Sequence, residues 1–359
     1  MRIKFKILCA AAVAAAPFFL FAKDPFAGFY EGKILGAKSY PLEHSPEVYG
    51  RVVKDGDTYK FDLLSAVFAR SESHCSASGL AAKDGKIELK NTAGANLKGE
   101  ITPEGIKASG ELNGNKVELS LRRMDVKSPT LGLEAPAGAV MLFDGKDMSQ
   151  WVQAYDGSPC AWDLKDGAMV SKPLSVDGKR RDGTIRSKGK FGAFRMHLEF
   201  KIPPSGSGNS GVYVGPYEIQ VFNSFGREGS WYDCGSIYRQ HPPKVNASLE
   251  PEAWQTYDIE YRPAQFDGGR LISHPTFTVY HNGVRIHNAK FDGDTLVEFP
   301  RFTVYLNGVL VQKDTPAYSC TSIGPRNFAK FKHPRNGVQL NLQDHTNKVA
   351  YRNIWVQPL

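Results

Sequence analysis

Short alternating segments, separated by glycine-rich turns, fill almost the whole chain of 359 residues. From Phe194 to Ile202, apolar side chains alternate with charged ones, which is the period of a half-buried β-strand. Asp-Gly, Pro-Glu-Gly and Asn-Gly turns lie between such segments, and no sustained helical periodicity interrupts them. The sequence therefore predicts an all-β protein. Alternation recurs over 106–112, 117–121, 212–222, 254–261, 276–280, 302–306, 338–342 and 349–356.

The first 22 residues have the composition of a secretory signal peptide. Three basic residues precede an apolar, alanine-rich stretch over 7–21 that is too short for a comfortable membrane span. We expect cleavage after Ala22 and a periplasmic or secreted protein. No later stretch approaches the length of a membrane span, so none is expected after the signal is removed.

The texture of the sequence divides the remaining residues into three parts. Residues 23–123 consist of short strands between tight turns and predict a small antiparallel β domain, a barrel or a meander, in an accessory role. Residues 124–138 are rich in Pro, Gly and Ser and are predicted to be a linker. Residues 139–359 predict a larger β-sandwich or jelly roll.

Charge and cofactor motifs exclude several classes of function. The formal net charge is +8, but the basic residues are scattered and do not form a nucleic-acid-binding surface. The sequence has no phosphate-binding loop, dinucleotide fingerprint or zinc spacing, so it requires no cofactor. A calcium site stays open as an alternative. Its candidate ligands are Asp258, Glu260, Asp292 and Asp294.

Four cysteines remain once the signal peptide and Cys9 are removed, an even number suited to an oxidising compartment. One or two disulfides are therefore plausible, with three ways of pairing. These cysteines are Cys75, Cys160, Cys234 and Cys320.

The segment from Gly206 to Gln240 is the best candidate for a binding site. On a strand over 217–221, Glu218 and Gln220 share one face, and the apolar side chains lie on the other. A carboxylate, an amide and aromatic rings between glycine-rich loops favour a sugar-binding face over a simple solvated one. The candidate substrate-binding residues of this segment are Asn209, Tyr213, Gln220, Trp231, Tyr238 and Arg239.

A second polar cluster ends the segment 338–345. Gln339, Asn341 and Gln343 form an amide row, and amides suit sugar hydroxyls because each offers a donor and an acceptor. Asp344 and His345 follow, and His345 is a plausible proton carrier near neutral pH. His197 and Glu199, on the charged side of 194–202, either line a groove or form an ordinary outer face.

Several short motifs occur in the order found in the 3-keto-disaccharide hydrolase domain family, which residues 140–359 resemble. The resemblance implies a concanavalin-like jelly-roll sandwich, a secreted or periplasmic setting and a glycoside oxidised at C3 as substrate. The motifs are Leu142-Phe143-Asp144-Gly145, Gly208-Asn209-Ser210-Gly211, Tyr217-Glu218-Ile219-Gln220, Asp233-Cys234-Gly235, Trp254-Gln255-Thr256-Tyr257, His281-Asn282-Gly283, Leu342-Gln343-Asp344-His345 and Tyr351-Arg352-Asn353-Ile354.

A ketone at C3 acidifies the hydrogen on C2, so a base can remove it and the enolate can expel the aglycone from C1 before water adds. That route needs a base, donors for the enolate oxygen and an acid. His345 or Glu218 is expected as the base, and Asp233 or Asp344 as the group that orients it. The expected oxygen-binding residues are Arg352, Gln220 and Asn209, and Tyr213 and Trp231 are expected to stack on the sugar.

Three alternatives remain open. A carbohydrate-binding module would use the same aromatic and amide faces without turnover. An ordinary glycoside hydrolase would need two acids about 5–10 Å apart, such as Glu218 with Asp233 or Glu199. A structural envelope protein would bind no saccharide.

Overall fold

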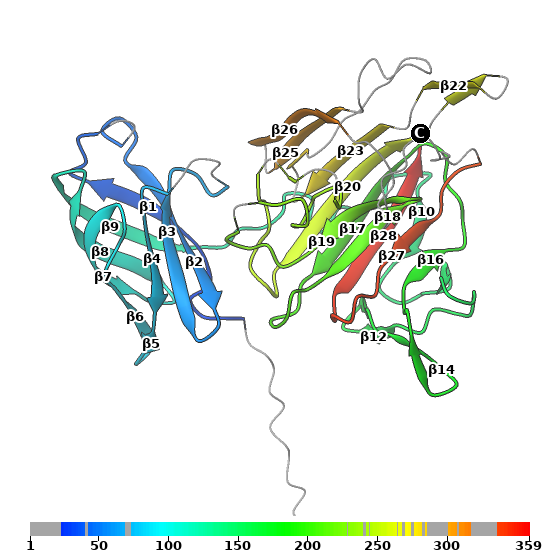
Figure 1. Cartoon of the computed structure of the whole chain (residues 1–359), viewed down its shortest axis with the longest axis horizontal. Coiled ribbons are helices and arrows are strands. Elements are labelled where there is room, and N and C mark those ends of the chain that lie inside the picture. The colour runs from blue at the N-terminus through cyan, green and yellow to red at the C-terminus, as the bar shows by residue number, and fades with distance from the viewer. Residues whose placement is uncertain are drawn as a thin grey trace, which may run out of the picture.

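The computed structural model describes two all-β parts, which Figure 1 shows side by side. The described residues are 23–39, 42–68, 73–227, 229–239, 242–243, 245–263 and 336–359, together with the backbone of six strands between 265 and 316. Cys320, Asp292 and Asp294 lie outside them. None of the described residues belongs to a helix with the length and hydropathy needed to cross a bilayer.

The first part is a nine-stranded antiparallel sheet in the order β4-β3-β2-β1-β9-β8-β7-β6-β5. A bridge between Ser76, in β4, and Ala93, just before β7, brings the two ends of this sheet together into a barrel. The strands are β1 (Gly28–Leu35), β2 (Glu47–Asp55), β3 (Thr58–Leu64), β4 (Cys75–Leu80), β5 (Ala82–Lys83), β6 (Lys86–Leu89), β7 (Ala95–Ile101), β8 (Gly105–Leu112) and β9 (Asn115–Met124).

Alternation along the barrel strands separates two sets of side chains. Tyr30 points into the barrel core, whereas its neighbour Phe29 belongs to the core of the second part. Leu64 and Phe68 join Phe29 there. The barrel therefore presents an apolar outer surface to the second part, and the two parts share packed side chains.

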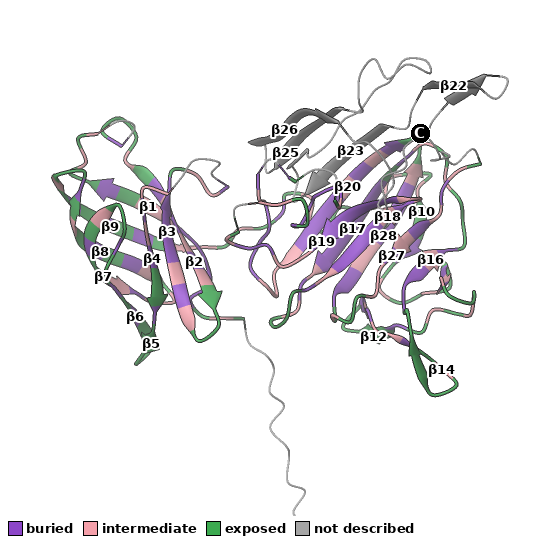
Figure 2. Ribbon diagram, in the orientation of Figure 1, coloured by how far each residue is buried: buried purple, intermediate pink, exposed green. Residues whose placement is uncertain are grey.

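The second part is a β-sandwich. A large sheet runs in the order β12-β13-β28-β17-β20-β23-β24-β25-β26, with β10 paired to β28, and a five-stranded sheet runs β11-β16-β27-β18-β19. A hairpin of β14 and β15 and another of β21 and β22 stand apart. Residues from both of these sheets meet in one apolar core. Figure 2 shows most of β17 and β28 as buried.

The strands of the large sheet are β10 (Val140–Phe143), β12 (Asp163–Lys165), β13 (Ala168–Val170), β17 (Phe194–Lys201), β20 (Trp254–Arg262), β23 (Thr276–His281), β24 (Val284–Arg285), β25 (Arg301–Leu306), β26 (Val309–Pro316) and β28 (Ala350–Pro358). The remaining strands are β11 (Trp151–Gln153), β14 (Leu174–Val176), β15 (Lys179–Arg181), β16 (Ile185–Ser187), β18 (Ser210–Val214), β19 (Tyr217–Val221), β21 (Gln265–Asp267), β22 (Arg270–Ser273) and β27 (Leu340–Leu342).

The predicted all-β sandwich preceded by a small antiparallel β domain is confirmed, but one predicted strand is wrong. The range 212–222 is a hairpin rather than a single strand, because Gly215 takes φ +57 and Pro216 follows it. The hairpin places Tyr213 directly opposite Glu218. The C-terminal strand β28 lies inside the large sheet, between β13 and β17.

Residues 128–133, within the Pro- and Gly-rich segment between the two parts, form a strap across the outer face of the large sheet. Thr130 Oγ1 donates to Asp258 Oδ2 over 2.7 Å, and the backbone nitrogen of Gly132 donates to Glu199 Oε1 over 2.7 Å. The backbone oxygen of Leu133 accepts from Asn353 at 3.0 Å. The strap therefore supplies hydrogen-bond partners to polar side chains of β17, β20 and β28.

Beneath the strap, His197 and Glu199 are fully buried in a charged network. His197 Nδ1 lies 2.6 Å from Asp258 Oδ1, and the ring stacks on Trp355. Burial alone would lower the pKa of His197, but the hydrogen bond and charge of Asp258, with Glu199 nearby, outweigh it and raise the pKa. Burial would raise the pKa of Glu199, yet the surrounding donors, among them Arg352 at 2.6 Å, hold it at about 2.

Cys75, Cys160 and Cys234 are free thiols, so none of the three is joined to another. Burial raises the pKa of Cys75 to about 12 and that of Cys234 to about 11, which keeps both thiols protonated and unreactive at neutral pH. Cys234 packs in the sandwich core beside the Tyr257 hydroxyl at 3.2 Å.

Replacing Glu199 by Gln should lower the free energy of unfolding by roughly 3 kcal/mol, because it removes a buried carboxylate that accepts hydrogen bonds from Arg352 and from the Gly132 amide. Urea unfolding measures this loss. The pKa of Glu199 is depressed, so its stabilisation is complete above the ordinary value of 4.5 and declines as the pH falls toward 2. The variant should lack that part of the acid destabilisation. The matched control is Glu134→Gln, because Glu134 is an exposed glutamate directly after the strap. It should change the free energy of unfolding by less than about 0.5 kcal/mol. Equal losses in the two variants would contradict a structural role for Glu199.

Candidate functional site

The outer face of the five-stranded sheet carries a row of polar side chains across four neighbouring strands. Arg186 on β16 pairs in register with Asn341 on β27, Asn341 with Tyr213 on β18, and Tyr213 with Glu218 on β19. The apolar neighbours of these residues point into the core, so the row faces away from it. Three strand spacings separate the ends of the row by roughly 14 Å, about the length of a disaccharide.

Glu218 is the chemical centre of this row. Its side chain is almost completely buried at 3% exposure, and burial raises the pKa of its carboxyl to about 7, although a hydrogen bond from Tyr213 opposes the shift. Burial and the neighbouring Glu218 charge raise the pKa of Tyr213 as well, so its hydroxyl keeps its proton. Gln343 Nε2 donates to that hydroxyl over 3.2 Å. Gln343, Tyr213 and Glu218 thus form one hydrogen-bonded chain.

Gly211 lies on β18, opposite Gln220 of β19, and makes room for the Glu218 carboxyl. A Cβ atom on Gly211 would meet Glu218 Oε1 at 2.5 Å and Cγ at 2.9 Å, both closer than real contacts allow. The backbone of Gly211 needs no positive φ, so space is the reason for glycine here. The carboxyl therefore lies flat against the sheet.

Three polar atoms on this face are buried and have no hydrogen-bond partner within the described part of the chain: Arg186 Nε, Gln220 Oε1 and Gln343 Oε1. Such atoms normally find partners in a folded protein, because an unsatisfied buried group costs about 1–3 kcal/mol. Gln220 Nε2 does have one, Asn209 Oδ1 at 3.3 Å. This face therefore holds one donor and two acceptors that the described part of the chain leaves unpaired, and a sugar has hydroxyls of both kinds.

The loop over 230–239 runs along the edge of β19 and extends this face. Gly235 donates to the Gln220 backbone oxygen, and Tyr238 donates to that of Glu218 at 3.1 Å. Trp231 is 44% exposed and lies 6.1 Å from the Tyr238 ring, and the Arg239 guanidinium lies 6.0 Å from the indole. An exposed indole with a second ring and a cation beside it is suited to stacking on a sugar.

Asn209, Tyr213, Gln220 and Gln343 are thus brought together with Glu218, and Trp231, Tyr238 and Arg239 lie on the adjoining loop. Asp233 lies elsewhere, since its Oδ1 accepts from Arg227 Nε at 2.6 Å and from Ser224 at 3.3 Å. It holds the base of the loop together.

Asp344, His345 and Arg352 are not part of the row that carries Glu218. Asp344 accepts from the backbone nitrogens of Gly183 and Thr346, so it closes a turn, and His345 is exposed. Arg352 lies on the outer face of the other sheet, where its guanidinium binds Glu199 and stacks on Trp254 at 3.9 Å. It belongs to the network beneath the strap, on the opposite side of the sandwich from Glu218.

Arg186 and Asn341 belong to the row but were not among the candidates from the sequence. β16 has only three residues, too few for alternation to identify it as a strand. Asn341 had a signal, since it lies in the amide row between Gln339 and Gln343.

No group of three His, Cys, Asp or Glu side chains among the described residues has the geometry of a metal site. Two of the four candidate calcium ligands are described, and both have other partners. Asp258 binds His197 and Thr130, and Glu260 pairs with Arg195 and Arg262.

An all-β sandwich with a buried carboxyl in an amide-rich face and exposed rings beside it has the features of a carbohydrate-active protein. The chain belongs to the 3-keto-alpha-glucoside-1,2-lyase-like domain family, whose sequence profile matches residues 138–357. The family resemblance seen in the sequence is thereby confirmed. Membership supports a hydrolase-like role on glycosides.

Solved structures from Parabacteroides distasonis ATCC 8503 are similar to this chain. One candidate glycosyl hydrolase is 29% identical, with 63% of this chain and 85% of that chain covered and a TM-score of 0.47. A second is 19% identical, with 62% and 94% covered and a TM-score of 0.41. No curated protein matches the chain.

The Glu218 carboxyl should titrate near pH 7. Carbon-13 NMR of protein labelled at the glutamate side-chain carboxyl should show one resonance that moves around that pH and is missing from Glu218→Gln. Because the folded pKa is raised, the free energy of unfolding attributable to Glu218 should fall as the pH rises from 4.5 to 7. Gly211→Ala should shift this titration by crowding the carboxyl, whereas Gly192→Ala, which meets nothing within 4 Å, should leave it unchanged. A Glu218 resonance that titrates below pH 5 would contradict the burial argument.

Proposed function

We propose that this protein cleaves glycosides that carry a ketone at C3, with the row on the five-stranded sheet as its active site. The family supports glycosides as the substrate class, and its description names elimination across C1 and C2 of a 3-keto-glucoside. One observation within this chain carries the proposal. A nearly fully buried carboxyl whose pKa is about 7 lies in a face of unsatisfied sugar-compatible donors and acceptors.

Glu218 is the proposed general base. A base works best when its pKa lies near the working pH, because it is then both sufficiently ionised and sufficiently basic. Burial raises the pKa of Glu218 to about 7, which meets this condition. At pH 7 about half of the carboxyl groups are ionised and able to accept a proton. His345 is exposed and stays the second candidate, so both residues enter the test below.

The reaction begins when Glu218 takes the proton from C2. The C2–H electron pair forms a C2=C3 enolate, and the negative charge rests on the C3 oxygen. The enolate re-forms the ketone as the C1–O bond breaks, which leaves a C1=C2 double bond in the sugar. The aglycone oxygen leaves with the bond's electrons and takes up a proton. Water then adds across C1=C2, with hydroxyl at C1 and hydrogen at C2.

The neighbours of Glu218 suit the other parts of this chemistry. Tyr213 keeps its proton and donates a hydrogen bond to the ionised Glu218; once Glu218 has taken the proton from C2, the hydroxyl can turn to the leaving oxygen or the enolate. Arg186 carries the buried, unsatisfied Nε and a permanent positive charge, fit for the developing enolate. Gln220, Gln343 and Asn209 bind the remaining hydroxyls, and Trp231 with Tyr238 supports a sugar ring beyond the row.

The two-carboxylate alternative loses support from the positions of its partners. Asp233 is bound by Arg227 and Ser224, and Glu199 is bound by Arg352 beneath the strap. Each of these carboxylates already has a structural role. Trp231, Tyr238 and Arg239 are equally suited to a binding module without turnover, so the test must separate binding from cleavage.

We also propose that the protein works in the periplasm or outside the cell, on the strength of the basic and apolar composition of residues 1–22.

The test of the reaction is incubation of the protein with 3-keto-trehalose or 3-keto-lactose, beside the unoxidised sugars, followed by NMR in D₂O. We expect cleavage of the oxidised sugars alone, with deuterium at C2 of the product. Glu218→Gln should lower kcat/KM by about 10²–10⁴, and Arg186→Met by about 10²–10³. Arg195→Met, an exposed arginine on the other sheet, is the matched control and should be near wild type. His345→Ala should also be near wild type.

Cleavage of both sugars without exchange at C2 would indicate ordinary glycosidase chemistry instead. Binding of a saccharide by isothermal titration calorimetry with no cleavage would favour the binding module. A loss of activity in His345→Ala that equals the loss in Glu218→Gln would remove Glu218 as the sole base.

Edman sequencing of the protein recovered from the periplasmic or extracellular fraction of expressing cells should begin at Lys23, because the predicted cleavage follows Ala22. Recovery of Met1 in the cytoplasmic fraction alone would contradict secretion.

A further inference from the structure

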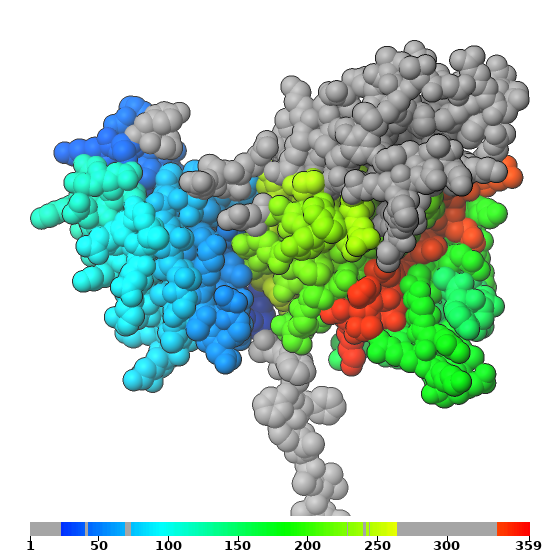
Figure 3. Space-filling view, viewed as in Figure 1, coloured from blue at the N-terminus to red at the C-terminus, as the bar shows by residue number. Residues whose placement is uncertain are grey.

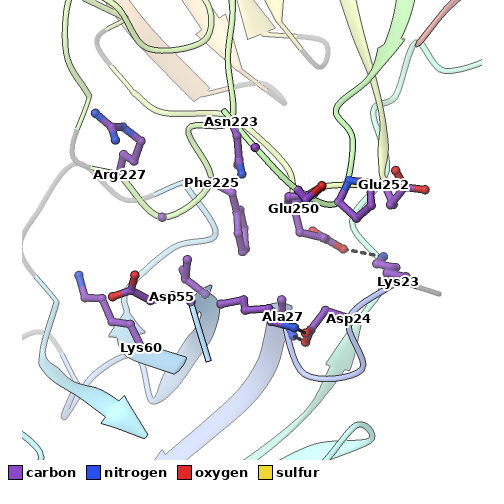
Figure 4. A pocket seen from close by; sticks show the side chains of 18 of the residues that line it. Lys23, Asp24, Ala27, Asp55, Lys60, Asn223, Phe225, Arg227, Glu250 and Glu252 are labelled. Carbon is purple, nitrogen blue, oxygen red and sulfur yellow. Dashed lines mark hydrogen bonds and ion pairs between the residues drawn. The ribbon is translucent and has the colours of Figure 1, made fainter. Parts of the chain in front are cut away.

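The barrel meets the sandwich at the loop over 223–227, which leads directly into the loop that carries Trp231. Phe225, on the sandwich side, packs edge-to-face on Phe29 of the barrel at 5.4 Å, and Phe29 packs in the same way on Phe68 at 5.6 Å. Figure 3 shows the two parts in contact over this region, and Figure 4 shows Phe225 directed toward the barrel. The contact is apolar and buried, because Phe225 is only 6% exposed.

Gly226, next to Phe225, lies against the barrel strand β2 with no room to spare. A Cβ atom on Gly226 would approach Val53 Cγ2 to 2.3 Å, and its φ of +75 is itself unfavourable for other residues. Glycine is therefore required by the approach of the two parts as well as by the turn. The Val53–Gly226 contact fixes where this loop lies relative to the barrel.

The same loop is tied firmly to the sugar-binding loop. Arg227 Nε bonds Asp233 at 2.6 Å, and Asn246 Nδ2 donates to the backbone oxygens of Ser224 and Arg227. Ser224 Oγ accepts from the backbone nitrogen of Cys234 at 2.8 Å. A change in the backbone position at Gly226 would therefore also move Asp233 and Cys234, through their hydrogen bonds with Arg227 and Ser224.

Residues 235–238 in turn pair with β19, at Gln220 and at Glu218 itself. Next to Gly226, a cleft of about 820 Å³ opens between the two parts, with the Lys23–Glu250 ion pair of 2.6 Å on its wall (Figure 4). Support of the loop by the barrel is therefore concentrated at Phe225 and Gly226 on this side.

We propose that the barrel is a positioning element for substrate binding: it holds the loop over 223–239, and with it Trp231 and Tyr238, through the contact of Val53 with Gly226. This role rests on the proposed function of the Glu218 face. The barrel contributes no group to the chemistry; it sets the distance between the aromatic pair and the base. Gly226 and Val53 are accordingly positioning residues.

The test compares Gly226→Ala with Gly229→Ala in the full chain. Both glycines have positive φ, +75 and +88, so the backbone strain of an added Cβ is similar. Only Gly226 faces the barrel, since the nearest atom to a Cβ on Gly229 is Pro243 O at an ordinary 3.6 Å. We expect Gly226→Ala to raise KM about 10-fold with kcat changed by less than about 3-fold, and Gly229→Ala to change neither.

The double variant Gly226→Ala with Val53→Ala should restore KM, because it removes the methyl group that the new Cβ would meet at 2.3 Å and leaves the new Cβ against the Cβ of residue 53 at 3.2 Å. A second readout is independent of turnover. Hydrogen exchange at the Gly235 and Tyr238 amides, which bond β19, should speed up in Gly226→Ala and recover in the double variant.

The outcomes separate this inference from the proposed function. An active wild type with unchanged KM and unchanged exchange in Gly226→Ala overturns the positioning role alone. A wild type inactive on every keto-glycoside overturns the proposed function, and the exchange measurement then decides whether the barrel orders the loop. Equal effects in Gly226→Ala and Gly229→Ala, or no recovery in the double variant, also overturn the role, since loop strain alone would explain them.

Discussion

Burying one carboxyl group governs the arrangement around the proposed active site. Glu218 lies out of water on the outer face of a sheet, where a charge is costly, so its protonated form is favoured. The sequence around it serves that burial: Gly211 leaves space, Tyr213 donates a hydrogen bond, and the loop over 230–239 closes the edge of β19. The same burial gives Glu218 the pKa of about 7 on which its proposed role as base rests.

The two sheets deal with buried charge in opposite ways. Beneath the strap, Glu199 has Arg352, Asn353 and the Gly132 amide as donors, and its pKa falls to about 2. Glu218, on the other sheet, is left with a raised pKa among unsatisfied polar atoms. Donors around a buried carboxylate favour its charged form, whereas burial with few donors favours the protonated form. The contrast separates two glutamates that look alike in the sequence.

Alternation in the sequence predicted the fold class and the faces of Glu218 and Gln220 because a strand reverses its side chains at every residue. Alternation did not predict which of the two sheets a strand joins, and the position of a candidate residue depends on that. Arg352 lies on β28, in the opposite sheet from Glu218, and nothing local to its strand specifies that pairing. Asp233 and Asp344 lie close in sequence to residues of the Glu218 face. The groups that bind their carboxylates belong to loops, and alternation does not predict contacts between loops. Gly215-Pro216 did mark a turn within 212–222, and that signal was present in the sequence.

The position of β28 also affects how the chain can be made. This strand is formed by residues 350–358, yet it hydrogen-bonds β10, β13 and β17 inside the large sheet. During synthesis the large sheet cannot be completed until residues 350–358 have left the ribosome, whereas the barrel strands, all before residue 125, are available much earlier. The barrel can therefore form while the large sheet still lacks one of its inner strands.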